Sequence, residues 1–245
     1  MSDPATAPTP SFWELPEVPR ALPFAAFLLI GSFAGAATEA SAYWVYVLKT
    51  FVGAALLWHF RPRLAELRWA VSWEAVVVGV LIAALWIGLD GRIPALGTLY
   101  DTIGSRFTGK PVEAPKPEAP WNPLAFFKDN APLGYAILVV RVVGRSFVVP
   151  MVEELFYRSF FHRFIASQDF LGLPIGLWNL RAFAITSVAF GLAHPGQWVQ
   201  GIVCGAAYQF LVIRHKRLGD SITAHAITNA LCSAYAIAAG KWEFT

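Results

Sequence analysis

The chain has 245 residues, of which 56% are hydrophobic and only 14% are charged, and its formal net charge is +3. Globular proteins in water carry about 25% charged residues, so this chain lacks the charges that a water-exposed surface needs. The composition therefore predicts an all-α, polytopic membrane protein. The small net charge gives no support to nucleic-acid binding, so no nucleic-acid partner is expected.

Residues 1–20 contain no basic segment followed by an apolar core, so they do not resemble a signal peptide, and we expect a disordered tail. Seven later stretches approach the roughly 20 apolar residues that cross a bilayer as a helix. They are residues 21–38, 41–60, 70–89, 133–152 (with a continuation to 166 left open by Pro150), 180–194, 197–213 and 220–239. The sequence thus predicts about seven transmembrane helices.

A polar, proline-rich stretch at residues 90–131 divides these helices into two groups. Three helices precede it, within residues 21–89, and four follow it, within residues 132–240. Because prolines interrupt regular hydrogen bonding, we expect residues 90–131 to be an extended or irregular loop. The C-terminal four-helix group is the candidate core.

Basic residues are unequally shared between the two sides that seven helices would define. Ten lie on the side of the N-terminus: Arg20, Arg61, Arg63, Arg68, Arg158, Arg163, Arg181, Arg214, Lys216 and Arg217. Six lie on the other side, mostly in the long loop: Arg92, Arg106, Lys110, Lys116, Lys128 and Lys241. Since short cytoplasmic loops are enriched in Lys and Arg, we expect a cytoplasmic N-terminus, an external C-terminus and a place in a bacterial inner membrane.

Ionisable side chains inside apolar segments cost free energy and often mark a functional site. The candidates are Lys49, Glu74, Arg141, Arg145, Glu153, Glu154, Arg158, His162, His194, Asp220 and His225. Several have a simpler interpretation, because Lys49 can extend towards water or form an ion pair, and Glu74 and Asp220 lie near segment ends. Cys204 and Cys232 form no CxxC pair and are expected to be small buried side chains.

The sequence VEELFYR at residues 152–158 assigns different roles to its two glutamates. Glu154 and Arg158 are four residues apart, so on a helix they lie on one face and can form an ion pair. Glu153 lies about 100° further around the helix and keeps its lone pairs available. The alternative is that both glutamates only form an architectural ion-pair cluster.

Two later segments add polar groups to this pair. FGLAH places Phe190 and His194 on one helical face, and HAITN places His225 and Asn229 on one face of the last helix. A base, a second proton-handling group and hydrogen-bond donors are what amide hydrolysis requires. Counted along straight helices that start on one side, however, His194 and His225 are expected at different depths.

The segments EELFYR, FGLAH and HAITN fit the patterns EExxxR, FxxxH and HxxxN in that order. Residues 133–240 thereby resemble the CPBP family of intramembrane proteases, which includes CAAX prenyl endopeptidases, bacteriocin-processing and immunity proteins and lysostaphin resistance protein A-like proteins. The resemblance implies an endopeptidase that acts on a membrane-anchored protein or peptide. It also implies that Glu153 and His194 activate water, that His225 and Asn229 stabilise the oxyanion, and that Glu154 and Arg158 organise the site.

Three alternatives stay open at this point. A catalytic zinc ion uses three protein ligands and one water, which Glu153, His194 and His225 could supply, although HExxH is absent and a mechanism without a cofactor is favoured. A non-catalytic scaffold or immunity protein could bind a peptide in the same cavity. A transporter that relays protons would show an inverted repeat, and no repeat is found.

Overall fold

The computed structural model describes residues 11–34, 38–109 and 121–244, and within these ranges the chain forms helices and turns without a β-strand. The expected all-α class is therefore confirmed. The main helices are α1 (Val18–Gly31), α2 (Glu39–Phe60), α3 (Trp73–Gly88), α4 (Leu96–Thr108), α5 (Pro123–Phe126), α6 (Ala131–Val143), α7 (Val149–Glu154), α8 (His162–Ala166), α9 (Leu180–Leu192), α10 (Trp198–His215) and α11 (Gly219–Ala239).

Three helical stretches in the described ranges are long and apolar enough to cross a membrane. They are Ala40–Arg63, Ala131–Ala166 and Gly219–Ala239. Val18–Gly31, Trp73–Gly88 and Leu180–Leu192 are apolar but shorter. The chain is thus an integral membrane protein, whereas the number of about seven crossings stays a prediction.

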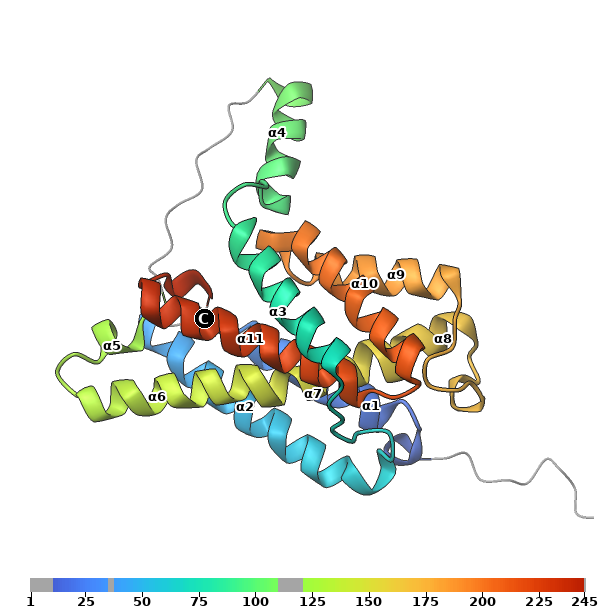
Figure 1. The fold of residues 1–245 in the computed structure, drawn as a ribbon. Coiled ribbons are helices and arrows are strands. Elements are labelled where there is room, and N and C mark those ends of the chain that lie inside the picture. The colour runs from blue at the N-terminus through green and yellow to red at the C-terminus, as the bar shows by residue number, and fades with distance from the viewer. Residues whose placement is uncertain (1–10, 35–37, 110–120, 245) are drawn as a thin grey trace, which may run out of the picture.

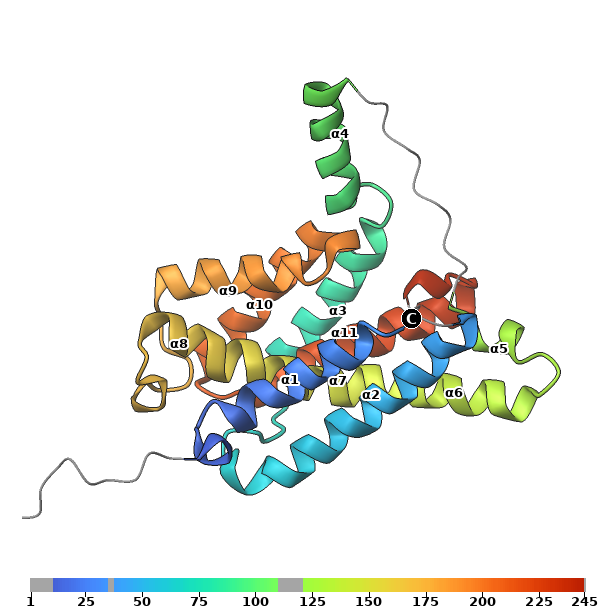
Figure 2. The same cartoon turned by 180° about the vertical axis from the view of Figure 1, so that it is seen from behind.

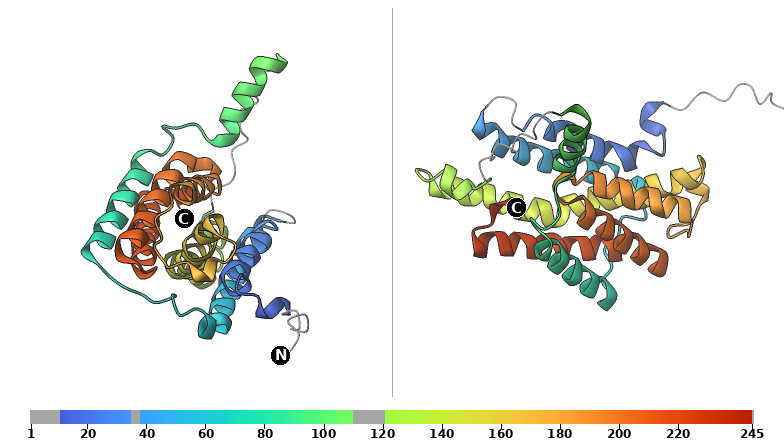
Figure 3. Two further views of the ribbon diagram at one scale, coloured as in Figure 1. Left: turned by 90° about the vertical axis from the view of Figure 1, so that its right-hand side faces the viewer. Right: turned by 90° about the horizontal axis from the view of Figure 1, so that it is seen from above.

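The α6–α8 stretch lies at the centre of the molecule. Figures 1 and 2 show it running alongside α2 and α11, and an end-on view places it between the α1–α2 pair and the group formed by α3, α9, α10 and α11 (Figure 3). In that group α9 packs on α10 and α3 packs on α11. The helix that carries both glutamates therefore contacts both halves of the chain.

Pro150 does not interrupt this central helix, which continues from Ala131 to Ala166 over 36 residues. Two wide π-helical turns, at Gly144–Val148 and Leu155–Phe161, absorb the irregularity. In the first of them the Val149 N–H donates to the Gly144 carbonyl, five residues back. The wider turn gives the proline ring the space that an α-helical turn denies it.

The prediction that residues 90–131 are irregular is wrong for Leu96–Thr108, which form the helix α4. The prolines that suggested a loop lie outside these 13 residues, and Gly109, with φ +69°, ends the helix. Tyr100, Ile103 and Phe107 are exposed on α4, which projects away from the other helices (Figure 1). Residues 110–120 lie outside the described residues.

The expected disordered tail is also too long. Residues 1–10 lie outside the described residues, but Phe12–Glu14 form a 3₁₀ turn and α1 begins at Val18. The Arg63 guanidinium donates to the carbonyls of Trp13, Glu14 and Leu15, at 2.9 Å for Glu14 and 3.1 Å for Leu15. These bonds attach the segment to the end of α2.

Glu66, in the connection between α2 and α3, joins three parts of the chain. Its Oε1 accepts hydrogen bonds from Arg20 Nε at 2.7 Å and from Ser159 Oγ at 2.6 Å. Burial raises the pKa of the Glu66 carboxyl, but the hydrogen bonds from Ser159, its own backbone and Arg20, with the charge of Arg20, lower the pKa below 4.5 overall.

Glu66→Gln is expected to lower the free energy of unfolding by about 2 kcal/mol at neutral pH, because bonds to a charged acceptor are lost. A carboxyl whose pKa is lowered by folding stabilises the protein above its unfolded pKa, and this contribution is lost as pH falls through the folded pKa. The stability difference between wild type and variant, measured by unfolding in detergent from pH 7 downwards, should therefore vanish below the folded pKa of Glu66. A difference independent of pH would contradict this account.

Candidate active site

A cavity of about 80 Å³ lies among the helices of the C-terminal half, with room for a few water molecules. All four residues expected to act in catalysis line it: Glu153, His194, His225 and Asn229. The other lining residues are Trp86, Arg145, Val149, Phe190, Cys204, Tyr208, Thr228 and Cys232. The structure therefore brings side chains from α3, α7, α9, α10 and α11, with the first π turn and the residue after α9, to one enclosed space.

Glu154 is fully buried beside this cavity and joins two cationic or proton-carrying side chains. Its Oε2 lies 3.2 Å from Arg158 Nε, which confirms the ion pair expected from their spacing. Its Oε1 lies 3.0 Å from His225 Nδ1, a contact across 71 residues that the sequence did not predict. Because a carboxylate can only accept, His225 Nδ1 must carry a proton and donate it.

Glu153 has a different environment from its neighbour. Its Oε2 is buried and makes no hydrogen bond with the described residues, while Glu153 lines the cavity. The same oxygen lies 4.0 Å from His225 Nε2, beyond hydrogen-bond range. The expected division between a paired glutamate and an available one is therefore present in the geometry.

His194 lies two residues beyond the end of α9, with φ −121° and ψ 64°, so it is not on the helix as expected. Its Nδ1 lies 2.8 Å from the Phe190 carbonyl, four residues back. A carbonyl only accepts, so Nδ1 carries the proton and Nε2 keeps its lone pair. Local structure thus prepares His194 to accept a proton through Nε2.

The expected difference in depth between His194 and His225 is not found. The rings of Phe190, near the end of α9, and His225, in the second turn of α11, are 5.9 Å apart between centroids. Phe190 and His194 are 4.9 Å apart in the same way. The end of α9 therefore lies beside an early turn of α11, which brings both histidines to one cavity.

Asn229 Nδ2 donates to the Arg145 carbonyl at 2.9 Å. This carbonyl has lost its helical partners, because the Val149 N–H bonds to Gly144 instead and Pro150, next in line, has no N–H. A buried carbonyl without a partner costs free energy. Asn229 therefore satisfies the backbone beside Pro150 and keeps only its second amide hydrogen for other partners.

Asn229→Ala is expected to destabilise the wild-type chain by about 1–3 kcal/mol, because it leaves the Arg145 carbonyl unsatisfied. In a Pro150→Ala background the cost should be smaller, since the substituted residue regains a backbone N–H that can reach this carbonyl. Unfolding free energies of the two single variants and the double variant form the test. Equal costs of Asn229→Ala in both backgrounds would show that Pro150 and Asn229 are not coupled.

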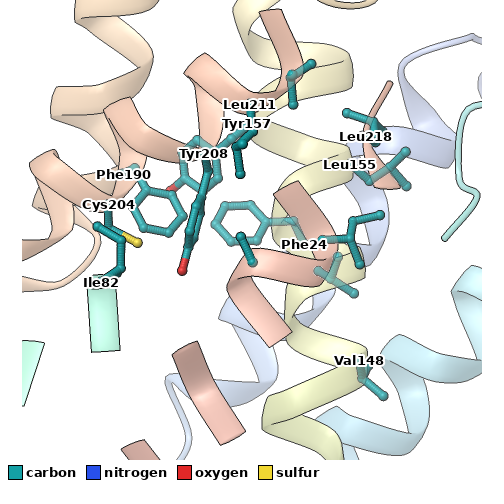
Figure 4. Packing of buried hydrophobic residues seen from close by; sticks show 14 of the residues in the cluster. Phe24, Ile82, Val148, Leu155, Tyr157, Phe190, Cys204, Tyr208, Leu211 and Leu218 are labelled. Atoms are coloured by element: carbon teal, nitrogen blue, oxygen red, sulfur yellow. The ribbon is translucent and has the colours of Figure 1, made fainter. Parts of the chain in front are cut away.

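Aromatic and sulfur side chains complete the cavity wall. Tyr208 Oη donates to Thr228 Oγ1 at 2.7 Å, and its ring stacks on His225 with centroids 5.1 Å apart. Cys204 and Cys232 are free and buried, as expected, and both line the cavity. Figure 4 shows Cys204, Phe190 and Tyr208 gathered at this place. The sequence reasoning missed Tyr208, for which the only signal was a hydroxyl within an apolar segment.

Most other ionisable candidates lie elsewhere and have structural partners. Glu74 lies 2.5 Å from His215 Nε2 and 3.4 Å from Arg214 Nε, and Asp220 pairs with Arg217 at 2.6 Å. His162 Nε2 donates to the Leu177 carbonyl at 3.1 Å. Lys49 lies over the rings of Phe27 and Tyr46, and Arg141 over those of Tyr46 and Trp121. Arg145 alone among them lines the cavity, and it donates to the Phe244 carbonyl.

The zinc alternative can be compared with this geometry. In the described part of the chain, no group of three His, Cys, Asp or Glu side chains gathers closely enough to hold a metal ion. The set Glu153, His194 and His225 shares the cavity but does not form a preassembled coordination site. The donors as placed do not fit a bound zinc ion.

Comparison with known proteins agrees with the expected resemblance. Residues 135–231 match the family model described as type II CAAX prenyl endopeptidase Rce1-like. This range contains both glutamates, Arg158, both histidines and Asn229. No curated protein and no solved structure matches the chain. Residues 135–231 are thus a domain of the Rce1-like type II CAAX prenyl endopeptidase family, a family of membrane proteases.

Proposed function

We propose that the chain is an intramembrane endopeptidase that hydrolyses a peptide bond in a membrane-anchored protein or peptide, with Glu153 as the general base. One observation carries this proposal. Glu153 Oε2 is buried, has no hydrogen-bond partner in the described chain and faces a cavity that has room for water. A carboxylate kept in this state is costly for folding alone, and it is what water activation requires.

In the proposed reaction a water molecule is held between Glu153 and Nε2 of His194. Glu153 removes a proton from the water as its oxygen attacks the peptide carbonyl carbon. The proton then passes to the departing amine when the carbon–nitrogen bond breaks. The available lone pair on His194 Nε2, set by the bond from Nδ1 to Phe190, supports its role in orienting the water.

His225 and Asn229 stabilise the oxyanion of the tetrahedral intermediate in this proposal. His225 already donates from Nδ1 to Glu154, so it can donate from Nε2 only as an imidazolium, and the Glu154 charge favours that form. Asn229 contributes the amide hydrogen that is not bonded to Arg145. Glu154 and Arg158 act by holding His225 in place.

The substrate is proposed to be a protein or peptide with a membrane anchor at its C-terminus. The family description names CAAX prenyl endopeptidases, and a prenylated C-terminus is one member of this class. The excess of basic residues in the loops on the N-terminal side supports a bacterial inner membrane with a cytoplasmic N-terminus.

Comparison of protein termini in host membranes tests the activity. Membranes with the wild-type chain and with Glu153→Gln/His194→Gln are analysed, at matched levels of the two chains. New N- or C-termini that are present only with the wild type identify a protease and its substrate. Identical termini, with the host phenotype retained, would instead favour the peptide-binding scaffold or immunity protein.

Activity of the purified chain is expected to persist after metal chelation, because Glu153 and His194 activate water without a Lewis acid in this mechanism. Cleavage of the identified substrate is measured before and after treatment with a strong chelator and a metal-free desalting step. Loss of cleavage that added zinc restores would overturn the glutamate mechanism. The unfolding temperature of the treated chain serves as the control.

A further inference from the structure

A second cavity, of about 620 Å³, lies at the end of the molecule where α2, α8 and α10 finish. It is separate from the cavity around Glu153, and no residue lines both. Its lining has one carboxylate, Glu66, and five basic side chains: Arg20, Arg68, Arg163, Lys216 and Arg217. The wall therefore carries an excess of positive charge.

Two of the five cations are neutralised within the protein. Arg20 Nε and Arg163 Nη2 lie 2.7 Å and 3.9 Å from Glu66 Oε1. Arg163 also donates to the Leu173 carbonyl and to Ser159. Glu66 is thereby committed to the inner wall of the cavity and leaves the outer cations without a carboxylate.

The outer cations keep donors available. Arg68 is exposed, and its guanidinium forms no hydrogen bond, ion pair or ring contact with the described parts of the chain. Lys216 uses one of its three ammonium hydrogens, in a 2.8 Å bond to the Gly176 carbonyl. Arg217 binds Asp220 through Nε and Nη2 and retains Nη1. Three unsatisfied sets of donors thus surround one opening.

The position of Lys216 is held by the backbone. It ends α10 in the left-handed conformation, with φ 56°. Gly176, with φ +77°, approaches so closely that a Cβ there would lie 2.4 Å from the Val212 carbonyl oxygen. The connection between α8 and α9 is thereby fastened to the end of α10, and the ammonium group is kept at the rim of the cavity.

The rest of the lining is apolar and includes Trp69, Leu171 and Ile175. Trp69 and Leu171 are exposed. The same end of the molecule carries Arg61, Arg63 and Arg214, which belong to the side expected to be cytoplasmic. Anionic phospholipids concentrate in the cytoplasmic leaflet, and basic pockets between membrane helices bind their headgroups.

We propose that this cavity binds a phosphate-bearing anion through Arg68, Lys216 and Arg217. The phosphate group is supplied by an anionic phospholipid, whose apolar part lies against Trp69 and Leu171, or by a soluble phosphate. A bound anion also touches the segment that carries Arg68. That segment packs closely on α11, since a Cβ at Gly219 would lie 2.5 Å from the Arg68 carbonyl oxygen.

The test uses the full-length chain purified in a neutral detergent. Native mass spectrometry follows binding of dioleoylphosphatidylglycerol, of dioleoylphosphatidylcholine and of inorganic phosphate. The variant Arg68→Gln/Lys216→Gln removes two of the proposed donors. The variant Arg61→Gln/Arg181→Gln is the matched control, because it removes two exposed cations from the same expected side, outside the cavity.

Phosphatidylglycerol is expected to bind the wild type more tightly than phosphatidylcholine. Arg68→Gln/Lys216→Gln should weaken phosphatidylglycerol binding about 25-fold, at about fivefold per basic residue, and the control should not. Displacement of the lipid by inorganic phosphate would identify the soluble source, and no displacement would identify the lipid.

Equal binding of phosphatidylglycerol by the wild type and by Arg68→Gln/Lys216→Gln would overturn the proposal. Equal weakening in the control variant would do so as well, because it would show a general charge effect. If the double variant does not fold, Arg68→Gln alone replaces it. Arg68 has no side-chain partner to lose in the described parts of the chain, so this variant should keep its unfolding temperature and lose about fivefold in lipid affinity.

Discussion

Glu153→Gln is expected to lower the rate of peptide hydrolysis by about 10²–10⁴-fold, the contribution typical of a general base. The amide has nearly the same shape as the carboxylate but cannot take a proton from water. Folding should be unaffected, because Glu153 Oε2 makes no hydrogen bond within the described chain. The measurement is kcat for cleavage of the substrate identified from host membranes, together with the unfolding temperature of the variant.

Asp101→Asn is the control for this variant, since Asp101 is exposed on α4 and the change also removes one carboxylate. It should retain wild-type activity. Hydrolysis that continues at an undiminished rate in Glu153→Gln would assign the two glutamates to an architectural ion-pair cluster and would favour the scaffold interpretation.

Glu154→Gln is expected to act on stability and to lower the free energy of unfolding by about 3–5 kcal/mol, because it leaves the buried Arg158 guanidinium without its counter-ion. Arg158 is 1% exposed and Glu154 0%, so water cannot replace the lost partner. The variant should also lose activity, since the position of His225 depends on Glu154. Unfolding in detergent and accumulation in membranes both measure the effect.

A double variant separates the charge from the shape of this pair. Glu154→Gln/Arg158→Met removes both charges and should be more stable than Glu154→Gln alone, because no buried charge remains unpaired. A double variant as unstable as the sum of the two single variants would show that the ion pair is not coupled. Adjacent glutamates thus have separate expected effects, on hydrolysis for Glu153 and on stability for Glu154.

Interactions within one helix could be predicted from the sequence. The pairing of Glu154 with Arg158 follows from a spacing of four residues, and the separate direction of Glu153 follows from the next position along the helix. The scarcity of charge was enough to predict a helical membrane protein, because polar groups of the backbone must be satisfied within helices in a bilayer. The three motifs were enough to predict the family.

Contacts between helices could not be predicted in this way. A bilayer makes lipid-facing and buried side chains similarly apolar, so the sequence pattern does not show which faces meet. Small residues decide the approach instead. A Cβ at Gly79 would lie 2.7 Å from the Ala224 carbonyl oxygen, and one at Gly201 would lie 2.8 Å from Gly191 Cα. These close contacts set α3 against α11 and α9 against α10.

The amino-acid order therefore defined the helical class, the family and the two glutamates as chemically distinct groups. The tertiary structure decided that Glu154 meets His225, that Asn229 serves the carbonyl beside Pro150, and that His194 follows α9 instead of lying on it. It also gathered Arg68, Lys216 and Arg217 around a second cavity. The reason is physical: helical periodicity fixes angles within one helix, whereas the distance between two helices depends on how closely their backbones can pack.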